Sequence, residues 1–313
     1  MTDDFQAAQK RAQQMVRKLG IVDAYPFDHH FAQTPMGVMH YVDEGAGDPV
    51  LMLHGNPTWS FLYRDFIAAL SDAHRVIAPD HIGFGLSDKP QNEASYTIDA
   101  HIRNLEALVT NLDLRNVTLV MQDWGGPIGL GMAARHPDRI KDIVVMNTFG
   151  FYPPAAGMDP DNLKLPVPLR VMRKPGIGDF IVRRLGFFER IVMKLATADS
   201  ARLKSVHHAY KAVFEGRQDR AGVMAFPRLI PTRTADASAQ ILINETGPFL
   251  DNFSGRARIF WGMKDPLFPV AALDAWEARL PNAEVTRLPM AKHYLQEDAP
   301  DVIIPQLRTF LEG

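Results

Sequence analysis

The sequence has no cysteine at any of its 313 positions. This absence excludes disulfide bonds, cysteine-ligated zinc, iron–sulfur clusters and catalysis by a thiol. The net charge is only −2, so the balance of charge gives no reason to expect a nucleic-acid partner. Residues 1–20 hold no apolar run able to act as a signal sequence, and no later stretch reaches membrane-spanning length. We therefore expect a cytoplasmic protein whose partners include neither nucleic acid nor a membrane.

Apolar residues make up 46% of the chain and charged residues 22%, which is typical of a soluble globular protein with a large core. Strand-like and helix-like stretches alternate through residues 50–146 and again through residues 257–311. Such repeated units predict an α/β protein with a mostly parallel sheet covered by helices on both faces. A hairpin over residues 29–43 is expected to add the antiparallel strands. We predict further strands over residues 50–53, 75–78, 117–120, 140–146, 257–261 and 284–288, and helices over residues 5–19, 59–70, 96–112, 127–135, 270–280 and 300–311.

Residues 151–235 depart from this alternation, because they form helical segments interrupted by Pro and Gly, including Pro227 and Pro231. They carry 15 Lys and Arg against 7 Asp and Glu, a net charge of +8, and the rest of the chain has a net charge of −10. We predict a core domain of residues 1–150 and 236–313 and an inserted helical cap domain of residues 151–235. The basic cap is either a solvated face or a surface that docks on the acidic body of a second copy in a homo-oligomer.

The stretch around Asp123 carries the clearest chemical signal. A β-branched run leads into it and small helix-forming residues follow it, so Asp123 lies on a sharp strand-to-helix turn. The nucleophile elbow of α/β-hydrolases has this form. A carboxylate attacks without first losing a proton, which suits displacement at saturated carbon. Gly125 and Gly126 let the helix pass close to the turn. An Asp that only caps the helix is the alternative interpretation.

Asp123, Asp265 and His293 follow one another in the order nucleophile, acid and base, which is the chain order of α/β-hydrolase triads. Each lies at or just beyond the carboxyl end of a predicted strand, where ligands of parallel sheets bind. Taken singly, Asp265 also fits a turn residue and His293 a structural histidine. The two adjacent histidine pairs lack the helical spacing to carboxylates that a metal site needs, so no metal ligand is predicted.

Four motifs carry a family resemblance: HGNPT at residues 54–58, QDWGG at 122–126, WGMKD at 261–265 and HYLQED at 293–298. Together they resemble haloalkane dehalogenases over nearly the whole core, and FPRLIP at residues 226–231 resembles the end of that family's cap. The resemblance implies an eight-stranded α/β-hydrolase core, a helical cap and no cofactor. It also implies hydrolysis of a halogenated hydrocarbon by water to an alcohol, a halide ion and a proton.

The resemblance also implies the role of each site residue. Asp123 displaces the halogen and forms an alkyl-enzyme ester, which a water activated by His293 hydrolyses while Asp265 orients the imidazole ring. The side-chain N–H groups of Asn56 and Trp124 bind the departing halide, and their backbone N–H groups form the oxyanion hole. Four apolar residues follow strand ends or adjoin these positions and are predicted to line the pocket, with core packing as the alternative: Phe149, Phe151, Leu267 and Leu295.

Two departures from common patterns matter. Met121 lies two positions before the nucleophile, where hydrolases often have a small residue, so we expect a tighter turn. Asn147 lies at the end of the next strand, where some family members have a glutamate acid, and the acid role therefore falls to Asp265. An Asp acid with an Asn–Trp halide pair resembles the family's third subfamily, whose members tend to self-associate.

Three other functions fit parts of this sequence. An epoxide hydrolase shares the fold and the Asp nucleophile, but it needs two cap tyrosines, for which the cap offers Tyr152 and Tyr210, and it usually has an aromatic residue where Asn56 lies. Haloacetate dehalogenases hold the substrate carboxylate with arginine near the elbow, where this chain has Trp124. A catalytically weak hydrolase-fold binding protein commonly loses a triad member, and none is lost here.

Overall fold

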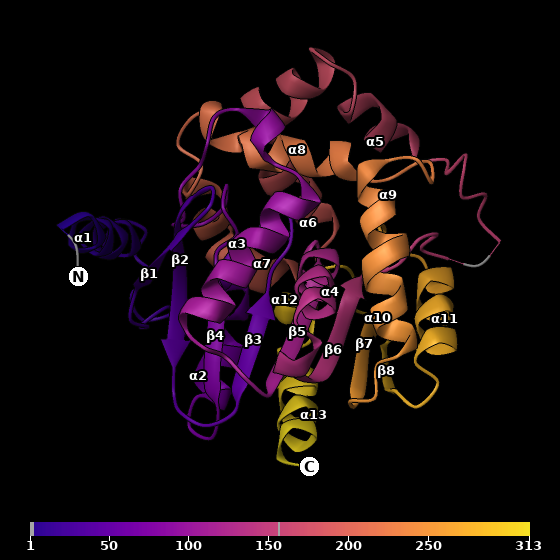
Figure 1. The fold of residues 1–313 in the computed structure, drawn as a ribbon. Coiled ribbons are helices and arrows are strands. Elements are labelled where there is room, and N and C mark those ends of the chain that lie inside the picture. The colour runs from indigo at the N-terminus through magenta and orange to yellow at the C-terminus, as the bar shows by residue number, and fades with distance from the viewer. Residues whose placement is uncertain (1–2, 156) are drawn as a thin grey trace.

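The computed structural model describes residues 3–155 and 157–313. Its centre is an eight-stranded sheet with the strand order β1-β2-β4-β3-β5-β6-β7-β8 (Figure 1). β2 pairs antiparallel with β1 and β4, and the other neighbouring pairs are parallel. The predicted α/β class, parallel sheet and early hairpin are confirmed. The strands are β1 His30–Thr34, β2 Gly37–Glu44, β3 Pro49–Leu53, β4 Arg75–Pro79, β5 Val117–Asp123, β6 Ile140–Thr148, β7 Ala257–Gly262 and β8 Glu284–Leu288.

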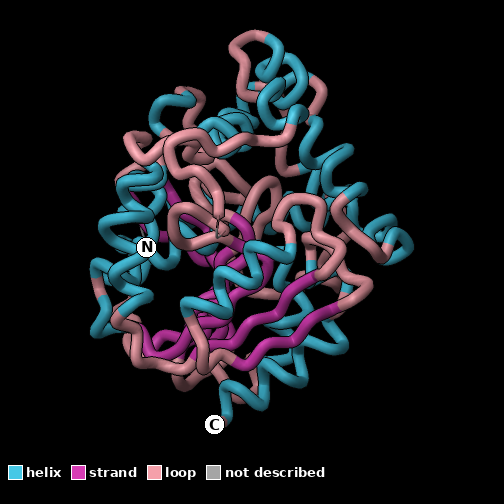
Figure 2. Tube along the Cα trace, turned by 90° about the vertical axis from the view of Figure 1, so that its right-hand side faces the viewer, coloured by secondary structure: helices cyan, strands magenta, loops and turns pink. Residues whose placement is uncertain are grey.

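Helices cover both faces of the sheet, which explains why β3 and β5 are buried along their whole lengths (Figure 2). α3, α4 and the run from α9 to α10 pack together as one layer, and α2 packs against α13 in the other. The helices of the core are α1 Asp3–Lys18, α2 Arg64–Leu70, α3 Ile98–Asn111, α4 Gly125–Arg135, α11 Val270–Arg279, α12 Leu295–Asp298 and α13 Pro300–Glu312, with short 3₁₀ turns at Ser60–Tyr63, Glu93–Ser95 and Pro137–Arg139. No helix in the described part of the chain is long and apolar enough to cross a membrane.

Between β6 and β7 the described chain forms helices and no strand, and most of these helices lie beyond one end of the sheet (Figure 1). They are α5 Val167–Met172, α6 Met193–Leu195, α7 Ser200–Ala212, α8 Ala221–Leu229, α9 Ala237–Ile241 and α10 Gly247–Asp251, with π-helical segments at Asp179–Arg184, Phe188–Val192 and Leu242–Thr246 and a 3₁₀ turn at Gln218–Arg220.

The prediction that Pro227 interrupts a helix is wrong, because α8 continues through it. Proline has no N–H to donate to the carbonyl four residues earlier, which here belongs to Val223. The side-chain amide of Asn56 donates to that carbonyl instead, at 3.3 Å. The bond that the helix lacks is thus replaced by a contact between α8 and the loop after β3.

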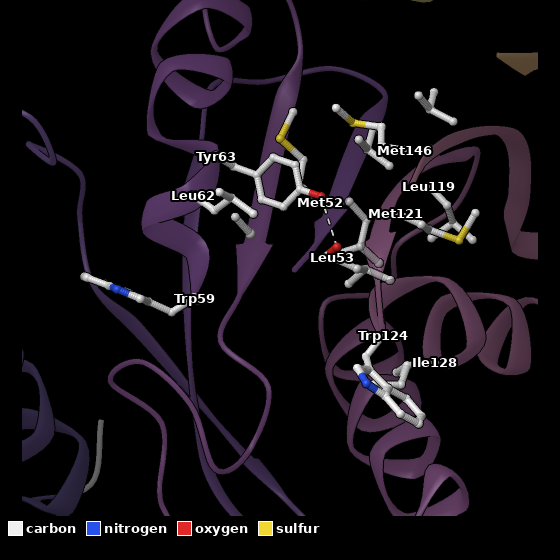
Figure 3. Packing of buried hydrophobic residues seen from close by; sticks show 14 of the residues in the cluster. Met52, Leu53, Trp59, Leu62, Tyr63, Leu119, Met121, Trp124, Ile128 and Met146 are labelled. Carbon is white, nitrogen blue, oxygen red and sulfur yellow. Dashed lines mark hydrogen bonds between the residues drawn. The ribbon is translucent and has the colours of Figure 1, made fainter. Parts of the chain in front are cut away.

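The bulk of Met121 is accommodated by the helix that follows the elbow. The Met121 side chain is fully buried, and a Cβ at Gly129 of α4 would lie only 3.0 Å from its sulfur. Figure 3 shows Met121 beside Leu53, with Trp124 just before α4 and Ile128 in the first turn of that helix. In the same view the Tyr63 hydroxyl donates to the Leu53 carbonyl, at 3.0 Å. A glycine on the helix therefore leaves room for the large residue on the strand.

A buried ion pair joins the segment between β6 and β7 to the core. Arg64 of α2 binds Glu297 of α12 through two hydrogen bonds of 2.6 and 2.8 Å, and the Glu297 side chain is fully buried. The Tyr210 hydroxyl and the Arg202 guanidinium of α7 also donate to Glu297. One carboxylate therefore holds three helices together.

Candidate active site

Asp123 is the last residue of β5 and has a φ of +50°, a left-handed backbone conformation that is rare for residues other than glycine. Such strain persists only where the surrounding structure enforces it, and it is common at functional sites. α4 begins two residues later. A Cβ at Gly125 would overlap the Leu53 carbonyl, and one at Gly126 would overlap Thr148. The predicted strand, sharp turn and closely passing helix are present.

The two carboxylate oxygens of Asp123 have different surroundings. The backbone N–H of Asn56 donates to Oδ1 at 2.8 Å, and the backbone N–H of Trp124 lies close enough to lower the pKa of the carboxyl group. Oδ2 lies 3.7 Å from Nε2 of His293. Burial raises the pKa of Asp123 above its ordinary 3.8, while His293 and the two N–H donors oppose that rise. One oxygen is therefore held by amide donors and the other faces a base.

His293 is oriented by a chain of hydrogen bonds. Its Nδ1 lies 2.9 Å from Oδ2 of Asp265, and the Asn147 side-chain amide donates to the same oxygen at 2.5 Å. The backbone N–H of Leu267 donates to the other Asp265 oxygen at 2.7 Å. Burial opposes a charge on His293, but Asp265 and then Asp123 outweigh it and raise the pKa of the imidazole. The predicted nucleophile, base and acid are thus brought together.

Asn147 and Gln122 are polar partners that sequence reasoning did not assign. The sequence indicates only that Asn147 cannot supply a negative charge, yet its side chain anchors Asp265. Gln122 places its side-chain nitrogen 2.9 Å from Nε2 of His293. The signal for both was their position near the carboxyl end of a central strand: Gln122 directly precedes Asp123 in β5, and Asn147 lies at the end of β6, the strand beside β5.

Asn56 and Trp124 are both held by α8. The Asn56 amide donates to the Val223 carbonyl, so one of its two N–H bonds is used and the second remains for another acceptor. The Trp124 ring stacks on Phe226, with ring centres 4.6 Å apart and an angle of 9° between the planes. The FPRLIP motif that contains Phe226 therefore contacts the candidate halide residue Trp124 directly.

The four predicted pocket residues have different environments. Phe149 packs edge-on against Trp124 at 5.2 Å, which places it beside the candidate site. Phe151 packs on Trp276 of α11, Leu295 is fully buried, and Leu267 is 38% exposed. Their role in lining a pocket stays a prediction. Within the described residues, no group of three His, Asp or Glu side chains is arranged to hold a metal ion.

Comparisons with known proteins give the family. Residues 48–300 match the model of the α/β hydrolase fold family. A protein named haloalkane dehalogenase 2 from Mycobacterium tuberculosis is 39% identical, and the match covers 89% of this chain and 93% of that protein. The chain belongs to the haloalkane dehalogenase family. It is therefore an enzyme of the α/β-hydrolase fold.

Other family relatives and structures agree with this placement. The tetrameric structure of haloalkane dehalogenase DpaA from Paraglaciecola agarilytica has a TM-score of 0.77 and 30% identity, over 93% of this chain and 95% of that one. The haloalkane dehalogenase DatA from Agrobacterium tumefaciens has a TM-score of 0.80 at 27% identity, over 91% and 96% of the two chains. A further relative, from Shewanella oneidensis, is named cis-3-alkyl-4-alkyloxetan-2-one decarboxylase and is 38% identical over 91% of this chain and 89% of its own length.

Proposed function

We propose that this haloalkane dehalogenase family enzyme hydrolyses carbon–halogen bonds through an ester on Asp123. The observation that carries the proposal is the unequal environment of the two Asp123 oxygens. Asn56 N–H holds Oδ1 at 2.8 Å, and Oδ2 faces a histidine whose Nδ1 is paired with Asp265. This arrangement leaves one oxygen to attack and places the other where the ester carbonyl will need donors.

The first half-reaction is a displacement. One oxygen of Asp123 attacks the carbon that bears the halogen, the carbon–halogen bond breaks, and an alkyl ester forms. The leaving halide is an anion in a buried site, so it needs N–H donors directed to the position where its charge develops. We assign that role to the side chains of Asn56 and Trp124, each worth on the order of 3 kcal/mol in the transition state.

The second half-reaction is hydrolysis of the ester. Nε2 of His293 takes a proton from water, and the water oxygen attacks the carboxyl carbon of Asp123. The negative oxygen that results is stabilised by the backbone N–H groups of Asn56, which already donates to the Asp123 carboxylate, and of Trp124, which lowers the pKa of that carboxyl group. Asp265 keeps the ring oriented and stabilises its positive charge. The alcohol leaves, and the proton passes to bulk water.

The test is halide release from 1-bromobutane or 1,2-dibromoethane, together with mass spectrometry of the enzyme. Wild-type enzyme should release halide and alcohol in equal amounts, and Asp123→Ala should release none. His293→Phe should release about one halide per active site and retain an alkyl group on Asp123. Halide release that survives in Asp123→Ala would contradict the proposal.

Asn56→Ala tests the halide site separately. This change should slow halide release from a chloroalkane more than from an iodoalkane. Chloride is the poorer leaving group, so its release depends more on donors in the transition state. Equal losses for the two halides would count against Asn56 as a halide ligand.

A second candidate function is decarboxylation of a β-lactone, supported by the Shewanella oneidensis relative and by a second decarboxylase of that name, from Xanthomonas campestris, at 36% identity. Asp123 can attack ring carbon 4 of an oxetan-2-one, breaking the ring carbon–oxygen bond and leaving a carboxylate. Loss of CO₂ then forms the alkene as the bond to Asp123 breaks. No water is consumed and no proton is moved.

The two functions make opposite predictions for His293→Phe. Dehalogenation should stop at the ester, because its hydrolysis needs a base, whereas decarboxylation should continue. A cis-3,4-dialkyloxetan-2-one assayed for alkene and CO₂, beside the halide assay, separates them. Solvent ¹⁸O should enter the alcohol or Asp123 only in dehalogenation.

Epoxide hydrolysis has less support. Of the two cap tyrosines, Tyr152 donates to the Pro160 carbonyl at 2.6 Å and Tyr210 donates to Glu297. Both hydroxyls thus point to partners outside the candidate site, and an epoxide oxygen would need their protons. A binding protein without activity has little support either, because Asp123, His293 and Asp265 lie together.

We also propose the division into a core of residues 1–150 and 236–313 and a cap of residues 151–235. In support, α9 packs on α3, the π-helical segment after it packs on α4, and Arg135 of α4 pairs with Glu245 at 2.7 Å. We further propose that the basic cap docks on the acidic core of a second copy to form a homo-oligomer. The cytoplasmic location stays a prediction.

A further inference from the structure

Strand β6 has one extra residue where it passes the candidate nucleophile. Along β5 and β6 the pairing runs residue by residue as far as Gln122 and Met146. The next pair is Asp123 and Thr148, so Asn147 is skipped. Asn147 has a φ of +36°, in the left-handed region that asparagine tolerates better than most residues. An extra residue of this kind redirects the side chains around it, and here it places Thr148 opposite Asp123.

The Thr148 side chain is fully buried, and its hydroxyl donates to the main-chain carbonyl of Asp123. The Phe149 carbonyl lies 3.2 Å from the same hydroxyl and is the more distant of its two acceptors. Nε1 of Trp276 donates to the Thr148 carbonyl at 2.9 Å, and a Cβ at Gly126 would overlap the Thr148 hydroxyl. Thr148 is therefore itself fixed by contacts from α11 and α4 while it holds the Asp123 backbone.

We infer that Thr148 is a positioning residue that fixes the strained backbone of the nucleophile. Asp123 has a φ of +50°, and such a conformation persists only where surrounding contacts enforce it. The backbone N–H of Asn56 holds the Asp123 side chain at Oδ1, and the Thr148 hydroxyl holds its main chain. Together the two contacts define the direction of the other carboxylate oxygen. This inference rests on the proposed function, in which Asp123 attacks the carbon that bears the halogen.

Displacement at carbon depends on the direction of attack, because the oxygen must approach from the side opposite the halogen. A misplacement of about 1 Å can slow such a step about a hundredfold. Without the Thr148 hydroxyl, the turn at Asp123 can relax and its oxygen moves relative to the carbon. The side chains of Asn56 and Trp124 are held separately, by α8. Loss of the hydroxyl should therefore slow attack on chloroalkanes and iodoalkanes by the same factor, unlike Asn56→Ala.

The experiment measures the halide burst of wild type, Thr148→Val, Thr148→Ala and Thr148→Ser with 1-chlorobutane and 1-iodobutane. Valine has the shape of threonine without the hydroxyl, and serine differs from alanine only by the hydroxyl, so the hydroxyl is tested twice. Thr148→Val should slow displacement about tenfold or more for both substrates, and Thr148→Ser should be faster than Thr148→Ala by a similar factor. The inhibition constant of bromide should stay unchanged in every variant, because the halide donors remain in place.

Thr246→Val is the matched control. Thr246 is equally buried, and its hydroxyl donates to the carbonyl of Gly150, two residues beyond Thr148. The change removes a hydrogen bond of the same kind, so it should lower the thermal stability but leave both bursts unchanged. If Thr246→Val slows displacement as much as Thr148→Val does, the effect comes from general loss of packing and the inference is wrong.

A crystal structure of Thr148→Val gives a test that needs no turnover. It should show a changed φ at Asp123 and a longer distance between Oδ1 and the Asn56 nitrogen. An unchanged Asp123, a wild-type burst in Thr148→Val, or equal bursts in Thr148→Ser and Thr148→Ala would each assign Thr148 a packing role only. Absence of an ester on Asp123 in wild type would instead reject the proposed function.

Discussion

Asp123 and His293 need to be in their deprotonated forms at different stages of the proposed reaction. Displacement needs an ionised Asp123, whose pKa burial raises above 3.8. Hydrolysis needs a neutral His293. In the free enzyme burial lowers the pKa of this imidazole, but Asp265 and then Asp123 outweigh that effect and raise it above 6.5. Protonation of His293 stops hydrolysis, whereas displacement stops only when Asp123 itself gains a proton.

Lowering the pH through neutrality should therefore make the ester accumulate in wild-type enzyme. The halide burst in a rapid-mixing experiment should keep its amplitude while the steady rate after it declines. Quenched samples analysed by mass spectrometry should show a growing alkylated fraction. If burst and steady rate decline together, His293 does not limit the second step.

The candidate triad could be predicted because each residue follows a strand, and the ends of parallel strands meet at one edge of a sheet. Gln122 and Asn147 could not be assigned in the same way. Their roles depend on hydrogen bonds to His293 and Asp265, which come from the order of β5, β6, β7 and β8 in the sheet and not from spacing along the chain. In the sequence, a polar residue near a strand end that positions a catalytic side chain cannot be distinguished from one that only packs in the core.

At the level of elements, α8 links the cap to the candidate halide site through a proline. Pro227→Ala would supply an N–H for the Val223 carbonyl, and this N–H would compete with the Asn56 amide. We expect unchanged or higher thermal stability but slower displacement, with a greater loss for 1-chlorobutane than for 1-iodobutane. Halide bursts for the two substrates measure this difference.

Pro305→Ala is the matched control, because Pro305 also lies inside a helix, in this case α13. It should leave both bursts unchanged. If Pro227→Ala slows displacement equally for 1-chlorobutane and 1-iodobutane, the proline does not act through Asn56.

The ion pair between α2 and α12 should make a large contribution to stability. Removing one partner of a buried pair leaves an uncompensated charge and costs about 3–5 kcal/mol. Arg64→Met should lower the free energy of unfolding by about that amount in urea titrations. Arg103→Met is the control: Arg103 is 63% exposed in its pair with Asp99, and exposed pairs contribute under about 1 kcal/mol.

The pH dependence of this contribution has a definite sign. Burial alone would raise the pKa of Glu297, but Arg64, Tyr210 and Arg202 outweigh it and bring the pKa below 4.5. A carboxyl whose pKa falls on folding stabilises the protein above its unfolded pKa. The contribution is then lost as the pH drops through the lower, folded value. In urea titrations between pH 7 and pH 3, the wild-type protein should lose the contribution of Glu297 to its free energy of unfolding only at the acid end. A loss of this contribution already at neutral pH would contradict a lowered pKa of Glu297.

Over the whole molecule, the proposed cap differs from the proposed core in more than its charge. Of eleven large hydrophobic residues that are clearly exposed in the described chain, six lie between residues 167 and 195: Val167, Ile177, Phe180, Leu185, Ile191 and Leu195. The net charge of +8 on the cap was visible in the sequence, but these exposed positions were not. In a short helix interrupted by proline, packing against the rest of the protein decides which residues face water. The spacing of apolar residues in the sequence does not define that packing.

A surface that is both basic and apolar fits an acidic partner that also covers hydrophobic area, and the core of a second copy has a net charge of −10. Wild-type protein should therefore sediment as a species heavier than 35.0 kDa at low salt. It should become lighter when salt near 0.5 M shortens the range of the attraction to about 4 Å. Phe180→Ser with Leu195→Ser should shift the distribution toward monomer, whereas Val302→Ser, a change at an exposed position of α13, should not. A monomer at low salt would leave the cap as a solvated basic face.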